Sequence, residues 1–367
     1  MKENKKVLVS GASFAGLTTA YWMNRMGYQV TVVEISDHLK MGGTPVDIKD
    51  QTIEIVKRMG LFEKIKTHRI GPEKWEFKNS DDVSELVITL EKLPDNGFEI
   101  ERDILLQMLY DLVKDDVDFM FNNSIVVLDE KQDGVKVSFR DGSVHQFEFV
   151  FGCDGVHSAV RRIWFGEEKE YVHFLGQYFC ISIADRLLVE KGTYQLYAEP
   201  NRSLALYAYR HKTDIIFTFR PEKEISYDFR NREQMKQIVL AQMQEMGWRT
   251  SELKDELISS GSFYFDKFCQ VKMPSWTKGR VALVGDAGYC ASPAAGMGGS
   301  LAIIGATALA DAFGKHNGDF VRAFEAYDEG LRPFIDEVQT AAVRMLDKLL
   351  PSTQEEIARR NRYGFEF

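Results

Sequence analysis

The sequence lacks the features that would tie it to a membrane or to nucleic acid. No run approaches the about eighteen consecutive apolar residues of a membrane span, and the charged N-terminus leads directly into an apolar stretch, so we expect no signal peptide. Asp and Glu (55) outnumber Lys and Arg (46), and the net charge of −9 disfavours nucleic acid or an anionic membrane as the main partner. We therefore expect a cytoplasmic protein. We also expect it to act as a monomer.

Cysteine is also scarce. The four cysteines show no metal-ligand or redox spacing, so we expect reduced, buried thiols and no metal site. Isolated histidines such as His157 and His173 are more often structural than catalytic. The sequence assigns no side chain to direct catalysis, and a bound cofactor is expected to carry the chemistry.

Three glycine-centred segments dominate what is present. They are Gly11–Gly16, Gly152–Gly155, and Gly285-Asp286 with the later Gly296–Gly299. A short apolar run precedes Gly11, Gly152 and Gly285. Such a run is typical of a buried parallel strand. Their order along the chain favours the phosphate, sugar and ring contacts of one flavin dinucleotide.

The first segment has the strand-turn-helix context of a dinucleotide fingerprint. Gly11 permits a tight turn, Gly16 allows close helix packing, and Ser13 stands where a further glycine would approach the pyrophosphate. Phe14 and Ala15 complete a turn whose helix N-terminus faces the phosphates. Glu34 ends the next apolar run and suits the adenosine ribose. The alternative is a βαβ turn without a ligand.

The third segment predicts the other end of the flavin. Asp286 follows the apolar run 280–284, at the carboxyl end of a strand, where its carboxylate suits a ribityl hydroxyl. A helix then opens with an N-terminal dipole directed at the isoalloxazine. Its entry comprises Pro293, Gly296, Met297, Gly298 and Gly299. An aspartate N-cap would explain Asp286 but not these glycines.

The middle segment, 149–161, again runs from strand to turn to helix, and the three segments together resemble the fingerprints of the group A flavoprotein monooxygenases of the p-hydroxybenzoate hydroxylase type. Met297 and Ser300 stand where that family has Gln and Asn. The stretches 41–48, 101–105 and 271–280 further resemble the tetracycline-inactivating monooxygenases. That resemblance implies that Gly43, Thr44 and Asp47 lie by the flavin and that Arg102 contacts it; the alternative for Arg102 is a surface pair with Glu101.

The resemblance implies FAD as cofactor, with NADPH or NADH as a transient co-substrate over Asp154 and Arg161. Molecular oxygen would form a flavin C4a-hydroperoxide that hydroxylates a small aromatic or polycyclic substrate. Tetracycline-like antibiotics are the favoured class. Two alternatives stay open, a group A hydroxylase of another aromatic or natural-product substrate and a flavoprotein that sequesters a ligand without turnover. A flavin halogenase is disfavoured because no Trp-x-Trp pair occurs.

The motifs predict an α/β fold in which a Rossmann-like FAD-binding domain is interleaved with an antiparallel-sheet substrate domain. The expected FAD-binding domain comprises 1–70, 100–165 and 270–330, the substrate domain comprises 72–98 and 170–268, and a C-terminal helical segment covers 331–367. Aromatic residues are dense between 176 and 220, which fits a pocket for a flat ring system. The substrate candidates are Gln195, Tyr207, Arg210 and Phe217.

Overall fold

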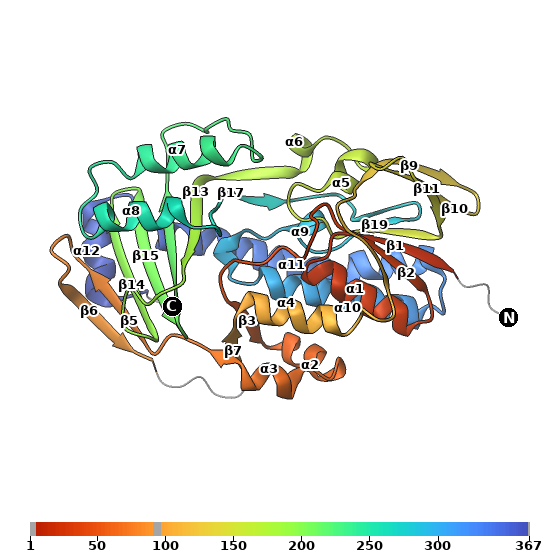
Figure 1. Cartoon of the computed structure of the whole chain (residues 1–367), viewed down its shortest axis with the longest axis horizontal. Helices are drawn as coiled ribbons and strands as arrows, with labels where there is room; N and C mark the ends of the chain where they lie inside the picture. The colour runs from red at the N-terminus through yellow and green to blue at the C-terminus, as the bar shows by residue number, and fades with distance from the viewer. Residues whose placement is uncertain (1–4, 91–96, 366–367) are drawn as a thin grey trace.

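A six-stranded sheet forms the core of one half of the molecule (Figure 1). The computed structural model describes residues 5–90 and 97–365. The sheet has the order β18 (Thr277–Lys278), β19 (Val281–Leu283), β12 (Phe149–Gly152), β1 (Lys6–Ser10), β2 (Gln29–Val33) and β8 (Asp118–Met120), and all pairs are parallel except β18 with β19. The central strands have continuous apolar sequences because both faces of this sheet are covered.

Helices and a small sheet cover these strands. The long helices α1 (Phe14–Arg25) and α10 (Gly298–Lys315) pack against each other, and α4 (Arg102–Asp111) lies beside α1. The shorter helices α5 (Ala159–Trp164), α6 (Glu168–Tyr171) and α9 (Asp286–Tyr289) follow the fingerprint strands or link them to the second half. A three-stranded antiparallel sheet, β9 (Ile125–Lys131), β10 (Gly134–Phe139) and β11 (Val144–Phe147), closes the outer edge.

A seven-stranded sheet forms the other half. Its order is β17 (Tyr264–Val271), β13 (Val172–Ala184), β16 (Lys212–Phe219), β15 (Arg202–Tyr209), β14 (Thr193–Glu199), β5 (Lys74–Lys78) and β6 (Ser84–Thr89), and only β14 and β5 run parallel. The helices α7 (Arg232–Gln242) and α8 (Thr250–Ser259) cover one face, where they bury a cluster that includes Tyr178, Phe217 and Phe219.

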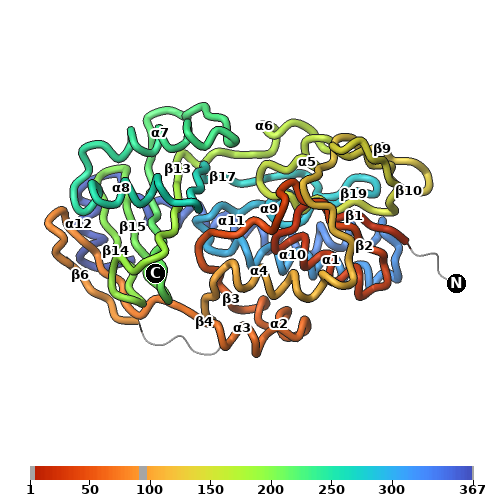
Figure 2. The backbone as a smooth tube through the Cα atoms, in the orientation of Figure 1, coloured from red at the N-terminus to blue at the C-terminus, as the bar shows by residue number. Residues whose placement is uncertain are grey.

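A small sheet and two C-terminal helices join the halves. The sheet β3 (Val46–Lys49), β7 (Gly97–Ile100) and β4 (Arg69–Ile70) lies between them, with α2 (Gln51–Arg58) and α3 (Phe62–Thr67) beneath it (Figure 2). Helix α11 (Phe320–Leu349) runs behind both halves, and α12 (Gln354–Tyr363) lies behind the seven-stranded sheet. Because α11 is continuous from 320, it passes through the predicted boundary at 331.

The observed fold is the α/β architecture that the sequence predicts, with a mostly parallel sheet in one half and a separate, mostly antiparallel sheet in the other. The predicted substrate segment 72–98 supplies β5 and β6, whereas β7 leaves that sheet for the small one; residues 91–96 of this segment lie outside the described residues. Within the described ranges, no helix combines the length and apolar character that crossing a membrane requires.

Candidate flavin and substrate site

The three strands that carry the glycine segments are neighbours in the sheet, in the order β19, β12, β1. Their carboxyl ends therefore meet at one edge. Gly11 has a φ of +103°, and a Cβ there would lie 2.5 Å from the carbonyl oxygen of Cys153. Gly285 has a φ of +68°, and its Cβ would lie 3.1 Å from that of Ala15. The close packing of these turns explains why glycine occupies both positions.

Glu34 organises the first turn. Its carboxylate accepts hydrogen bonds from the backbone N–H groups of Ala12 (2.8 Å) and Ser36 (3.0 Å). Gly16 lies directly over the turn, since a Cβ there would overlap the carbonyl oxygen of Gly11 at 1.8 Å. Helix α1 begins at Phe14, and the Ser13 side chain forms no hydrogen bond to its first turn. The N–H groups of that turn are available to an anion.

Arg102 connects the first fingerprint to the segment around Gly43. Its guanidinium donates to the carbonyl oxygens of Lys40 and Gly42, each at 2.9 Å, and to Ser13 Oγ at 3.3 Å. It also lies over the Phe14 ring, 5.2 Å from the centroid. Gly43, at a φ of +105°, has no room for a Cβ because Arg102 Cδ would lie 2.7 Å away. The alternative pairing with Glu101 is wrong, since Glu101 binds Arg210 and Lys212.

The entry to α10 packs against β3. Ser300 Oγ donates to the carbonyl oxygen of Asp47 at 2.6 Å, and a Cβ on Gly299 would lie 2.5 Å from Val46. Thr44 is half-buried in the segment before β3, and Met297 packs partly into the core. Gly298 faces open space, since an added Cβ would meet no atom within 4 Å. Ser300, which stands where the resembled family has Asn, therefore has a hydrogen-bond partner within the protein. The first turn of α10 presents free backbone N–H groups to the open space beside Gly298.

Asp286 begins α9 at the end of β19 and is half-buried. Burial raises its pKa to about 6, although a hydrogen bond with Cys290 lowers it again in part. A carboxylate at this position can accept hydrogen bonds from the hydroxyl groups of a polyol. After it, Pro293 opens a 3-10 turn that ends at Gly296, whose φ is +64°. The predicted cofactor residues thus fit a flavin dinucleotide in chemistry and in backbone clearance.

Asp154 and Arg161 are not placed for the predicted nicotinamide contact. The Asp154 carboxylate accepts from Ser158 Oγ (2.5 Å) and from the backbone of Ala159 (2.8 Å) and Val160 (3.1 Å), so it caps α5. Arg161 is fully buried and donates to the carbonyl oxygens of Ala287 (2.8 Å) and Val156 (2.5 Å). Arg161 thus links the second fingerprint to Ala287 of the third, whereas the Asp154 carboxylate bonds within its own segment.

The structure divides the four substrate candidates between two faces of the seven-stranded sheet. Directly paired residues of neighbouring strands share a face, and successive residues of one strand alternate. Gln195 pairs with Leu206, on the face that α7 and α8 cover, and its amide donates to Glu76 at 2.8 Å. Phe217 is fully buried on that face as well. Gln195 and Phe217 therefore lie on the opposite face of the sheet from Tyr207.

Tyr207 and Arg210 face the small central sheet. Tyr207 donates its hydroxyl to Glu99 Oε2 at 2.9 Å, on β7. Arg210 pairs with Glu101 and donates to the carbonyl oxygen of His68 at 3.1 Å. Glu99 and Asp214 were not singled out from the sequence. An aspartate within an otherwise apolar strand could have been a signal, because aspartate is depleted in strands.

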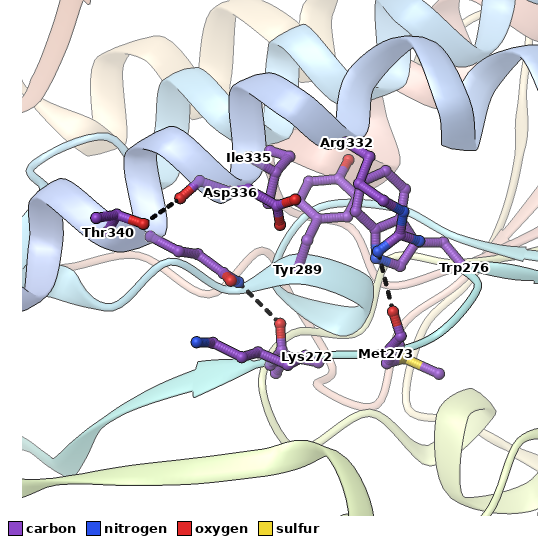
Figure 3. Close-up of a pocket in the computed structure, with 10 residues that line it drawn as sticks. Lys272, Met273, Trp276, Tyr289, Arg332, Ile335, Asp336 and Thr340 are labelled. Carbon is purple, nitrogen blue, oxygen red and sulfur yellow. Dashed lines mark hydrogen bonds between the residues drawn. The ribbon is translucent and has the colours of Figure 1, made fainter.

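A cavity of about 240 Å³ lies elsewhere, between β17 and α11 (Figure 3). Arg332 stacks on Trp276 at 4.3 Å and donates to the carbonyl oxygen of Met273 at 3.0 Å. Gln339 donates to the carbonyl oxygen of Val271 at 2.9 Å. The lining contains no residue predicted to bind flavin or substrate. These hydrogen bonds attach α11 to the sheet, so we regard the cavity as structural.

Comparisons with known proteins agree with the nucleotide site. The FAD binding domain family matches residues 4–339. A flavin-dependent monooxygenase of Legionella longbeachae is 34% identical over 358 residues, covering 95% of this chain and 91% of the relative. The crystal structure of tetracycline destructase Tet(51) superposes with a TM-score of 0.88 at 32% identity over 98% of this chain and 94% of that one, and Tet(55) with 0.86 at 30% over 98% and 95%. The chain therefore belongs to the FAD-dependent monooxygenases, and it resembles the tetracycline destructases among them.

Proposed function

We propose that this enzyme uses NADPH or NADH and molecular oxygen to hydroxylate a polycyclic or phenolic substrate, with tetracycline-like antibiotics as the favoured class. Bound FAD supplies the redox chemistry, the activation of oxygen and its transfer. The protein has to bind the flavin, orient the substrate against it and exclude water from the reacting atoms.

The observation that supports this most is the aromatic surface beside the flavin segment. Trp75 and Tyr194 stack at 4.3 Å between ring centroids, and Tyr194 lies 5.8 Å from Tyr207. Tyr207 in turn contacts Glu99, which pairs with Asp47 across β7 and β3. A Cβ on Gly296 would lie 3.8 Å from the Asp47 carboxylate. A flat fused-ring substrate would therefore stack close to the entry of α10.

Similarity to Tet(51) and Tet(55) favours tetracyclines over other aromatic substrates. The alternative of ligand sequestration without turnover loses part of its support at Ser300, since that side chain donates a hydrogen bond to Asp47 of β3. We propose the FAD contacts as Gly11 to Gly16, Glu34, Gly43 to Asp47, Arg102, Asp286 and the entry of α10.

Product mass tests the proposal. We expect oxygen-dependent oxidation of NADPH or NADH to accelerate with tetracycline and the product to gain the mass of one oxygen atom. A control without tetracycline measures uncoupled peroxide release. Unchanged tetracycline mass with accumulating peroxide would show that tetracyclines are effectors, and the enzyme would then hydroxylate another aromatic substrate.

A further inference from the structure

The small central sheet has a polar face on which two carboxyl groups lie side by side. Asp47 on β3 is directly opposite Glu99 on β7, and Lys49 shares their face because it lies two residues further along β3. All three residues are half-buried. The other face is buried and apolar, and it comprises Val46, Ile48, Phe98 and Ile100. Strand alternation therefore collects the charged residues of this sheet on its more open side.

This polar face lies between the entry of α10 and the seven-stranded sheet. On one side, a Cβ on Gly296 would lie 3.8 Å from the Asp47 carboxylate, and the carbonyl oxygen of Asp47 accepts from Ser300 Oγ. On the other side, the Tyr207 hydroxyl of β15 donates to Oε2 of Glu99 at 2.9 Å. The side chain of Asp47 remains 33% exposed. A substrate held at the entry of α10 would therefore lie next to this pair of carboxyl groups.

Glu99 has one carboxyl oxygen available to such a substrate. Among residues 5–90 and 97–365, the Tyr207 hydroxyl is the only donor to its side chain, and no cation forms an ion pair with it. Lys49, the cation on the same face, pairs with Asp47 at 3.3 Å. Oε1 of Glu99 can therefore accept a hydrogen bond or a proton from a substrate hydroxyl.

The surroundings of Glu99 make it a stronger base than an ordinary glutamate. Burial and the opposed Asp47 carboxylate raise its pKa to about 7, against the hydrogen bond from Tyr207 and the charge of Lys49, which lower it. Like charges on directly opposed residues repel each other, so the pair favours a state with one proton. A general base is most effective when its pKa lies near the working pH.

Five strands contribute groups that face Glu99. Strand β3 contributes a carboxylate and an ammonium group, β15 and β14 contribute phenols, β16 contributes a buried carboxyl group, and β4 places the apolar Ile70 opposite it. The titratable or charged residues in this set are Asp47, Lys49, Tyr207, Tyr194 and Asp214. Only Asp47 and Tyr207 adjoin Glu99 by strand pairing or a hydrogen bond, and they act on its pKa in opposite directions.

We propose that Glu99 is the general base of the hydroxylation, removing the proton from a phenolic or enolic hydroxyl of the substrate, and that Tyr207 and Asp47 are its positioning residues. Tyr207 orients the carboxylate through the hydrogen bond to Oε2, and Asp47 acts through its charge. This inference rests on the proposed hydroxylase function, and it deepens that function by naming a catalytic residue.

The proton and the electron pair of the substrate hydroxyl separate in this step. The O–H bond breaks, the proton passes to Oε1 of Glu99, and the electron pair stays on the substrate oxygen. The conjugated ring carbon becomes electron-rich and forms its C–O bond with the oxygen atom that the bound cofactor delivers, while the other atom of O2 becomes water with the two electrons of NADPH or NADH. Glu99 then releases its proton to solvent, and an aromatic carbon releases its own hydrogen as a proton.

Infrared difference spectra of the resting holoenzyme test Glu99 without turnover. Between pH 5 and pH 9, the wild type should lose the carbonyl band of a protonated carboxyl group with a midpoint near 7, and Glu99→Gln should lack this component. Tyr207→Phe should move the midpoint upward, because a hydrogen bond that lowers the pKa is lost. Asp47→Asn should move it downward, because a repelling charge is lost. A midpoint that neither variant moves would overturn the proposal.

Oxygen transfer to tetracycline, which carries phenolic and enolic hydroxyls, tests the base itself. In a single turnover of reduced holoenzyme, Glu99→Gln should slow product formation by about a hundredfold or more at pH 7 and much less at pH 9, where substrate hydroxyls ionise unaided. Glu99→Asp keeps a carboxylate and should recover part of the rate. The rate of flavin reduction should be unchanged in both variants. A merely structural role would not give a defect that depends on the ionisation of the substrate.

Glu54→Gln is the matched control, because Glu54 is an exposed glutamate on α2 that pairs with Lys57. It should keep the wild-type rate and infrared spectrum, and the flavin spectrum and a thermal melt check that each variant folds. Equal rates for Glu99→Gln and wild type, or an equal defect at pH 7 and pH 9, would overturn the assignment of the base.

Two outcomes separate this inference from the proposed function. Oxygen transfer by the wild type with no defect in Glu99→Gln would support the hydroxylase proposal and refute the base. A wild type that leaves tetracycline unoxygenated would refute the hydroxylase proposal for this substrate, whereas opposite infrared shifts in Tyr207→Phe and Asp47→Asn would still support Glu99 as a group that titrates near neutral pH.

Discussion

The hydroxyl of Tyr207 donates a 2.9 Å hydrogen bond to Oε2 of Glu99, and this contact joins the seven-stranded sheet to β7. Glu99 lies opposite Asp47 on β3, whose carbonyl oxygen accepts from Ser300 at the start of α10. Two hydrogen bonds and one strand pair thus connect Tyr207 to the predicted flavin helix α10. Such a connection fixes a bound ring system relative to the flavin without a mobile element between them.

Removal of the Asp286 carboxylate should weaken flavin binding. We expect Asp286→Ala to lose on the order of 1–3 kcal/mol of FAD affinity, the cost of removing a buried charged acceptor. Titration of the apoprotein with FAD, followed by absorbance, measures this loss. Asp311→Asn, on the exposed side of α10, should bind FAD as the wild type does. Equal affinities in Asp286→Ala and wild type would show that Asp286 only begins α9.

Ser13→Gly should leave FAD affinity unchanged or improve it. Ser13 Oγ accepts a long hydrogen bond of 3.3 Å from Arg102 and forms no cap on α1, so the hydroxyl contributes little to the turn. Glycine at this position lets a phosphate approach the backbone more closely. The same apoprotein titration measures the effect. A marked loss of affinity would instead show that the hydroxyl binds a phosphate oxygen.

The sequence predicted the fold well, and it also predicted where the glycine turns pack closely, for a physical reason. Glycine is required where backbone atoms meet closely, and the clearances at Gly11, Gly16 and Gly285 show that requirement. The apolar runs before these glycines identify parallel strands, and the structure makes those strands neighbours. Local sequence therefore predicts most of the structure of the half that contains the six-stranded sheet.

The sequence did not predict that the four substrate candidates lie on two faces of the sheet, because this depends on register. Alternation alone indicates that Gln195 and Tyr194 point to opposite faces, but it does not say which face α7 and α8 cover. Phe217 was selected as an aromatic residue in the right sheet, and it packs into the covered core. Asp214 and Glu99 come from two distant segments that meet at Tyr207, so no local pattern brings them together.

The buried carboxyl groups predict that stability falls as pH rises. The pKa values of Glu99 and Asp214 are raised to about 7 and about 8, mainly by burial, whereas unfolded carboxyl groups titrate near 4. Between these values the folded state binds more protons than the unfolded state, so the free energy of unfolding decreases with pH. The other groups acting on this pair are Tyr207, Tyr209, Asp47, Glu101, Lys49 and Lys212.

Asp214→Asn should reduce the decrease of unfolding free energy with pH, because the variant lacks one of the two titrating carboxyl groups. We expect the wild type to lose on the order of 5 kcal/mol of unfolding free energy from pH 5 to pH 8 through this pair, and the variant to lose less. Urea unfolding at several pH values measures the difference, with Asp311→Asn as the control. Parallel pH profiles for Asp214→Asn and wild type would mean that Asp214 is ionised in the folded state throughout this range.

We expect a second decrease of stability at higher pH from His157, which lies at the junction of the two halves. Its ring stacks on Phe229 at 4.4 Å and lies between two carboxylates, with Nδ1 3.2 Å from Glu168 and Nε2 3.4 Å from Asp266 on β17. Burial alone would lower its pKa, but these two carboxylates outweigh burial and raise the pKa to about 9. The histidine is therefore a cation that links the second fingerprint to the seven-stranded sheet.

A histidine with a raised folded-state pKa contributes stability that is fully present below its unfolded value near 6.5 and is lost as pH rises through the folded value. We expect His157→Gln to lose on the order of 1–2 kcal/mol at pH 6 and much less at pH 9.5, because the wild-type ring is then neutral. Urea unfolding at these two pH values measures the change. His173→Gln, which alters an exposed histidine on β13, should show no such pH dependence. An equal loss for His157→Gln at both pH values would assign the effect to ring stacking on Phe229 rather than to charge.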